Sequence, residues 1–155
     1  MTELMTELRD ILIDQISYCS DSGFVNRNAW SLVEGDKFPF FNIIKNGGKI
    51  EKLSNMNFND IERRIYKIEI QFATSALNEI TVFTGDDNRI GIEEFAEDIL
   101  TALKTDFTVN SVVQGLNPDN EVIEWEYSPE IIYLKNSYVA RATITLEYFN
   151  DVGKL

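Results

Sequence analysis

The chain of 155 residues carries 26 acidic and 14 basic residues, a formal net charge of −12, and 44% of its residues are hydrophobic. This length and composition predict one globular domain, residues 1–155, and argue against wholesale disorder. The negative charge argues against a nucleic-acid-reading module, because such proteins gain affinity from basic residues that neutralise phosphates.

The residue inventory also narrows the chemistry. The chain has no histidine, which removes the usual general base near neutral pH and the commonest transition-metal ligand. Its single cysteine, Cys19, excludes a disulfide within the chain and fits a reducing compartment. No apolar run approaches the ~18 residues of a membrane span, and the acidic N-terminal stretch does not support a secretory signal. We therefore expect no enzymatic activity, no cofactor and no membrane association.

The N-terminal segment predicts an amphipathic helix over residues 3–19, because its apolar residues recur at spacings of three and four. Cys19 lies on the apolar stripe of this helix, where a buried, unreactive thiol is favoured over a nucleophile. Residues 24–37 show no clear periodicity and are expected to be irregular, with Phe24 and Trp30 as anchors.

The next segment, FPFFNIIKNGG, predicts a strand over residues 38–44 with a proline near its start. The residues Asn46-Gly47-Gly48 are typical of a tight hairpin turn, which would lead into a short return strand over 50–53. The NGGK stretch does not form a phosphate-binding loop, since Ile43 and Ile50 occupy positions that require glycine and Ser or Thr.

Two long segments, residues 63–73 and 138–149, show the period-two alternation of strands with one buried and one polar face. Phe72 of the first segment and Trp125 of a shorter one are expected in the core. Phe149 lies on the polar face of the last strand, and we therefore expect it to contact another molecule.

Between the long strands, residues 92–104 carry an apolar stripe wide enough to cover a sheet and predict a second amphipathic helix. The remaining predicted elements are strands over 80–83, 109–113, 122–127 and 131–134 and a turn over 115–120. Together these elements predict an α+β fold, in which an antiparallel or mixed β-sheet is covered on one face by two amphipathic helices.

The acidic segment over residues 85–97 resembles a calcium-binding loop in part. Asp86, Asn88 and Glu97 are spaced as positions one, three and twelve of such a loop. However, the fifth position is Ile90, which has no oxygen donor in its side chain, and a strand is expected before the loop. We therefore expect no metal site and interpret the segment as a polar loop that leads into an acidic first helical turn.

The same region is a candidate contact surface, since the long loop expected over 75–89 would protrude and reach a neighbouring subunit. The candidate subunit or tube contacts are Trp30, Asp86, Asp87, Arg89 and Phe149.

Five segments carry a resemblance to a known family: ELRDILIDQI, FPFFNIIKNGGKIEKL, IYKIEIQFAT, GIEEFAEDILTAL and ARATITLEYF. In their order, and in the chain's length and acidity, they resemble the tail terminator (tail-completion) proteins of long-tailed bacteriophages. The resemblance spans most of the chain and implies a tail-terminator-like sandwich.

The resemblance also implies a function. It implies a homo-hexameric ring that caps the tail tube, stops its polymerisation and forms the joint to the head-completion or connector protein. DNA would pass through the ring without specific binding, and an acidic lumen would let the duplex slide. The protein would assemble in the host cytoplasm and reside at the head-proximal end of the tail. Two alternatives remain: another head-tail neck protein (stopper or adaptor), and a calcium-binding or carboxylate-dependent cytosolic module.

Overall fold

The computed structural model describes residues 2–35, 37–53 and 60–154, which form an α+β fold as predicted. A seven-stranded mixed sheet has the order β1-β2-β3-β7-β4, and β5 and β6 also pair with β7. In chain order the elements are α1 (Thr2–Gln15), the 3₁₀ turn η1 (Ser17–Cys19), β1 (Gly23–Val25), α2 (Ala29–Glu34), β2 (Phe40–Leu53), β3 (Asp60–Ala76), α3 (Glu79–Thr84), α4 (Ile92–Leu103), β4 (Gly115–Leu116), β5 (Glu124–Tyr127), β6 (Ile132–Leu134) and β7 (Ser137–Lys154).

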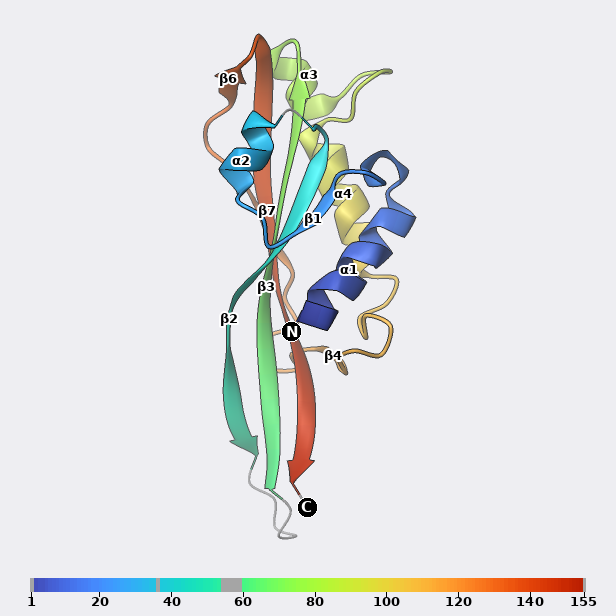
Figure 1. Cartoon of the computed structure of the whole chain (residues 1–155), viewed down its shortest axis with the longest axis vertical. Coiled ribbons are helices and arrows are strands. Elements are labelled where there is room, and N and C mark those ends of the chain that lie inside the picture. The colour runs from blue at the N-terminus through green and yellow to red at the C-terminus, as the bar shows by residue number, and fades with distance from the viewer. Residues whose placement is uncertain (1, 36, 54–59, 155) are drawn as a thin grey trace.

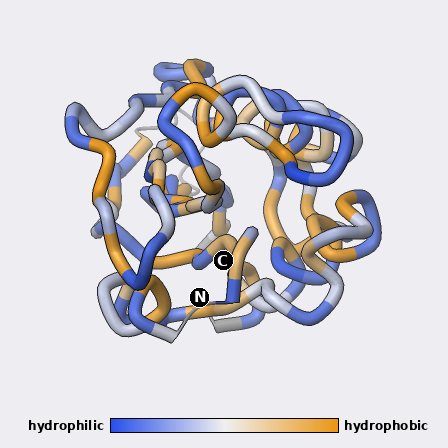
Figure 2. The backbone as a smooth tube through the Cα atoms, turned by 90° about the horizontal axis from the view of Figure 1, so that it is seen from above, coloured by the Kyte–Doolittle hydropathy of each residue, from blue (hydrophilic) through white to orange (hydrophobic). Residues whose placement is uncertain are grey.

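The main core lies between one face of the sheet and the helices α1 and α4 (Figure 1). Both helices bury their predicted apolar stripes, and the two long strands turn their predicted apolar sides toward them. Phe95 of α4 is fully buried and makes edge-to-face contacts with Phe72 of β3 and Tyr18, at centroid distances of 5.2 and 5.5 Å. The outer bends of the backbone are largely hydrophilic when the molecule is viewed along its long axis (Figure 2).

The opposite face of the sheet is partly covered by α2. Val33 of α2 packs on Phe40, Ala73 and Val139 in a small second core. The expectation of irregular structure over 24–37 was therefore wrong, because this stretch contains the end of β1 and the whole of α2. A local signal for α2 exists at Asn28, whose side chain accepts a hydrogen bond from the Ser31 amide and caps the helix.

The predicted hairpin at residues 46–48 was also wrong, since β2 continues through it and pairs with β3 on both sides. The glycines form a β-bulge between Lys45 and Gly48. Gly47 adopts a φ of 93°, and a Cβ atom at Gly48 would collide with the carbonyl oxygen of Ile65. The two glycines thus serve a close strand contact, and no separate return strand exists at 50–53.

Two predicted strands are absent. Residues 80–83 belong to helix α3, whose N-cap Asn78 accepts a hydrogen bond from the Thr81 amide at 2.7 Å. The predicted loop over 75–89 is consequently divided between the end of β3, α3 and a short loop. Residues 109–113 form turns, because Val109, Asn110 and Ser111 have φ values of 49°, 54° and 66°, which a strand does not allow.

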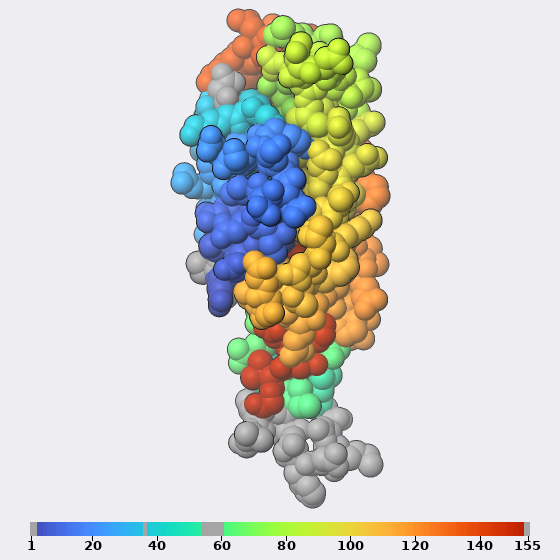
Figure 3. Space-filling view, turned by 90° about the vertical axis from the view of Figure 1, so that its right-hand side faces the viewer, coloured from blue at the N-terminus to red at the C-terminus, as the bar shows by residue number. Residues whose placement is uncertain are grey.

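The sheet extends well beyond the helices as a three-stranded arm, which we define as residues 45–53 of β2, 60–67 of β3 and 147–154 of β7. The arm runs to the lower end of the molecule in Figure 1, below α1 and α4. In the space-filling view, the last strand emerges in red beneath the body (Figure 3). The arm therefore presents much of its surface to its surroundings.

Candidate functional site

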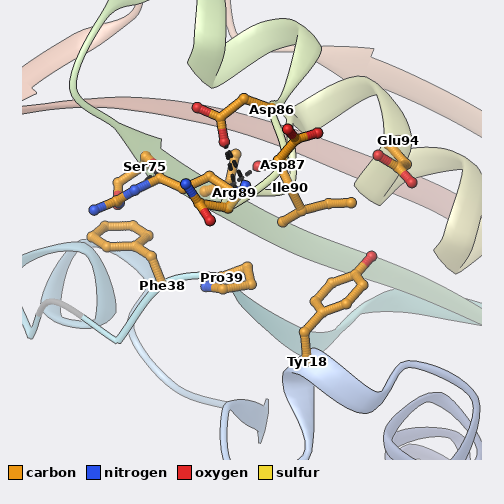
Figure 4. Close-up of a pocket in the computed structure, with 11 residues that line it drawn as sticks. Tyr18, Phe38, Pro39, Ser75, Asp86, Asp87, Arg89, Ile90 and Glu94 are labelled. Atoms are coloured by element: carbon orange, nitrogen blue, oxygen red, sulfur yellow. Dashed lines mark hydrogen bonds between the residues drawn. The ribbon is translucent and has the colours of Figure 1, made fainter.

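An open cleft lies between the loop that joins α3 to α4 and the segment that enters β2 (Figure 4). Its volume is about 740 Å³. The residues that line it are Tyr18, Phe38, Pro39, Thr74, Ser75, Asp86, Asp87, Asn88, Arg89, Ile90 and Glu94. The candidate contacts Asp86, Asp87 and Arg89 therefore share one surface.

Short-range hydrogen bonds shape the loop on one side of the cleft. The Asp86 carboxylate accepts hydrogen bonds from the backbone amides of Asn88 and Arg89, at 2.8 and 2.9 Å. The loop is tied to the end of β3, because Thr74 Oγ1 donates to the Ile90 carbonyl at 2.9 Å and Arg89 Nη1 donates to the Ser75 carbonyl at 3.3 Å. The Asp86 side chain thus organises the loop itself.

Two groups at or near the cleft, the Tyr18 hydroxyl and the Cys19 thiol, are held in their neutral forms. Burial raises the pKa of Tyr18, and its hydroxyl, which donates to Asp98 Oδ2 at 2.5 Å, is further kept protonated by that carboxylate. Burial raises the pKa of the Cys19 thiol to about 12. Cys19 is fully buried, as its position on the apolar stripe predicted. Neither group is an activated nucleophile or base near neutral pH.

The calcium alternative can be compared with this geometry. Within the described ranges, no three His, Cys, Asp or Glu side chains gather in a way that would hold a metal ion. The side chain of Ile90, at the fifth position of the loop, packs against the main core. One argument against a calcium loop fails, however, since helix α3 precedes the loop where a strand was predicted. Asn88 lies in this loop, and Glu97 is exposed on α4.

The two aromatic contact candidates lie away from the cleft. Trp30 is 47% exposed on α2, which covers the other face of the sheet. Phe149 is half-buried in the arm, where the guanidinium of Arg63 lies 4.9 Å from its ring centroid. Phe149 is thus already engaged within its own chain.

Sequence reasoning missed the exposed apolar residues at the sheet edges. Ile50 of β2 is 67% exposed, and Trp125 of β5 is 52% exposed. The prediction that Trp125 lies in the core was wrong, because β5 is a short strand at the edge of the sheet, whereas Phe72 is buried as predicted. The acids that flank Trp125 on both sides, Glu124 and Glu126, could have indicated this exposure.

No helix among the described residues is long and apolar enough to cross a membrane. Comparison of the chain with protein-family models and with curated proteins found no match.

Proposed function

We propose that the chain is a structural protein of a long-tailed bacteriophage that forms a homo-hexameric ring on the end of the tail tube. The ring stops polymerisation of the tube and forms the joint to the head-completion or connector protein. The five segments that carry the family resemblance support this proposal, because they fall on α1, β2, β3, α4 and β7, the elements that build the main core and the arm.

The observation that carries the proposal furthest is the arm. It extends the sheet beyond the covering helices, and no described strand pairs with the outer edge of β2 over residues 45–51, whereas β4 and its flanking residues cover β7 from Glu147 to Asp151. An isolated globular domain gains little from such a surface, and exposed edges invite unwanted pairing. A protein that must grip sister subunits and a tube has a use for it.

The chemistry of the cleft supports a binding role over a catalytic one. Tyr18 and Cys19 are kept protonated by their surroundings, and the Asp86 carboxylate is engaged with its own loop. Catalytic groups are instead expected to have a pKa matched to their task. The partners that we propose are therefore macromolecules: sister copies, the tail tube protein and the head connector.

The charge of the chain is compatible with the passage of DNA. The arm holds seven basic and five acidic residues, a formal charge of +2. Because the whole chain carries −12, the residues outside the arm carry −14. A ring with part of this acidic body on its bore would repel the phosphates, and the duplex would slide. A bore lined mainly by Lys and Arg would contradict this part of the proposal.

Electron microscopy of particles made without the chain tests the function. If the chain terminates tails, its removal yields overlong tails without heads. Complete tails of normal length beside heads that leak DNA would contradict tail termination and would identify the chain as a neck stopper. The head-proximal location in the virion is tested in the same particles by labelling the chain.

A further inference from the structure

The sheet has two edges with open backbone groups. On its outer side β2 pairs with β1 only at residues 41–43, so among the described residues no strand covers β2 from Ile44 to Glu51 (Figure 1). At the other side of the sheet, β5 pairs with β7, and no second strand of the described part joins it. Open strand edges are templates for pairing with another chain.

The two edges carry opposite charge. Lys45, Lys49 and Glu51 lie on the exposed part of β2, where the first two are well exposed, and the whole arm has a formal charge of +2. The stretch over residues 121–130 contains four acids and no base, and Glu124 and Glu126 of β5 are exposed. Lysines on an edge oppose its pairing with a second copy of the same edge and favour a strand rich in acids.

Each edge also exposes one large apolar residue on the same face of the sheet. Trp125 is opposite Ile144 of β7, which belongs to the main core. Ile50 pairs with Arg64 of β3, which pairs with Asn150 of β7. Asn150 lies two residues beyond Tyr148, which also belongs to the main core. Side chains alternate along a strand, so Ile50 and Trp125 both project toward the helical side. Pairing of the two edges would bring these side chains to the same side of the joined sheet.

From these three features we propose that the outer edge of β2 docks on the β5 edge of a second copy of this chain. The contact is head-to-tail, because opposite edges of one sheet meet, and contacts of this kind generate closed rings or filaments. The strands run antiparallel across it, since β2 is parallel to β7 and β7 is antiparallel to β5.

The neighbouring copy is displaced along the strands. Within one copy, the register across β3 and β7 places β5 at the same height in the sheet as residues 41–44 of β2. Residues 41–43 are occupied by β1, so the contact lies further toward the arm. Tilted strands in closed sheets show such a stagger. The proposal rests on the homo-oligomer of the proposed function and assigns the surfaces through which its copies meet.

Charge reversal tests the contact in the full chain. The variant K45E/K49E makes both edges acidic, and E124K/E126K makes both edges basic. The control K37E/K104E alters the net charge as much as K45E/K49E does, at exposed positions outside the contact. All four substituted contact residues are exposed, and the only ion pair lost among the described residues is the surface pair Lys49–Glu51. Circular dichroism confirms that each variant is folded.

Native mass spectrometry and sedimentation, at chain concentrations up to millimolar and at low and high salt, measure the self-association. We expect the wild type and the control to associate, and each contact variant to associate at least ~10-fold more weakly at low salt, since both joined edges then carry charge of the same sign. The chain with all four substitutions has the wild-type net charge and is expected to recover association. An equimolar mixture of the two double variants is expected to recover it as well, in mixed oligomers.

Three outcomes of the association measurements would overturn the inference: a wild type that stays monomeric throughout, contact variants that associate as well as the control, or a failure of the fourfold variant and of the mixture to recover association. Binding of duplex DNA that K45E/K49E abolishes, with unchanged self-association, would assign the arm to nucleic acid and would also overturn it. The inference and the proposed function fail separately. Normal tails in particles without the chain would refute tail termination only, whereas overlong tails together with fully active contact variants would refute the contact only.

Discussion

Phe95 of α4 is fully buried in the main core, and its replacement by alanine tests the account of how α4 is held on the sheet. Phe95 is 0% exposed and lies between the rings of Tyr18 and Phe72, at 5.5 and 5.2 Å. Loss of a buried phenylalanine side chain costs about 3–5 kcal/mol of the free energy of unfolding. Each aromatic pair contributes about 0.5–1.5 kcal/mol beyond its buried area, which places F95A at the upper end of that range.

Urea and thermal unfolding, followed by circular dichroism, measure this loss. For a chain of this size each kcal/mol lowers the Tm by roughly 2–4 °C, so F95A is expected to melt about 8–20 °C below the wild type. The matched control is F149A, which removes the same ring from a half-buried position in the arm. Because that ring is only half-buried and stacks with the Arg63 guanidinium, F149A is expected to cost about 1–2 kcal/mol. An F95A variant no less stable than F149A would refute the assignment of the core.

Three further predictions concern single side chains. Hydrogen bonds from Arg63, at 2.8 and 3.0 Å, lower the pKa of Asp151, so the folded state favours the carboxylate. The ion pair therefore adds about 1 kcal/mol to the free energy of unfolding. This contribution is complete above the unfolded pKa of Asp151, about 3.9, and is lost as the pH falls through its lower pKa in the folded state. D151N is expected to be less stable than the wild type at pH 7 and to match it in strong acid. The buried Cys19 thiol, with its pKa raised to about 12, is expected to resist a disulfide reagent at pH 8 until urea unfolds the chain, and rapid native labelling would contradict its burial. Asn42 is 0% exposed and donates to the Arg27 carbonyl at 2.8 Å and to Gln71 Oε1 at 3.0 Å, so N42A is expected to lose about 1–3 kcal/mol in urea unfolding, and a neutral effect would show that this buried polar pairing contributes nothing.

The long periodic elements could be predicted from the sequence, because their patterns repeat over many residues. The α4 stripe and the alternation of residues 63–73 and 138–149 each determine one buried face. The two longest strands extend further than predicted, since their outer ends in the arm lack the regular apolar side that contact with helices imposes.

Short segments were misread where local and long-range signals compete. A pair of glycines suits a tight turn or a bulge, and the continuous pairing of β2 with β3 decides for the bulge at Gly47 and Gly48. Residues 80–83 have the composition of a strand, but Asn78 caps a helix there. Trp125 is a large aromatic residue of the kind expected in a core, and it is exposed only because β5 lies at the edge of the sheet.

The candidate site was only partly predictable for the same reason. Asp86, Asp87 and Arg89 are close in sequence, and their shared loop follows from that closeness. The opposite wall of the cleft comes from Tyr18 and Phe38, more than forty residues away in the chain. Sequence patterns on separate elements do not specify which of them face each other.

The central claim is that the chain forms a ring on the end of a phage tail tube. Its most direct test is to mix the purified chain with tail tubes, measure the mass of the bound species, and image the tube ends by electron microscopy. The account predicts a ring with sixfold symmetry at one end of each tube, with no further growth from that end. Tubes that bind no chain, or that bind it along their whole length and continue to grow, would contradict it.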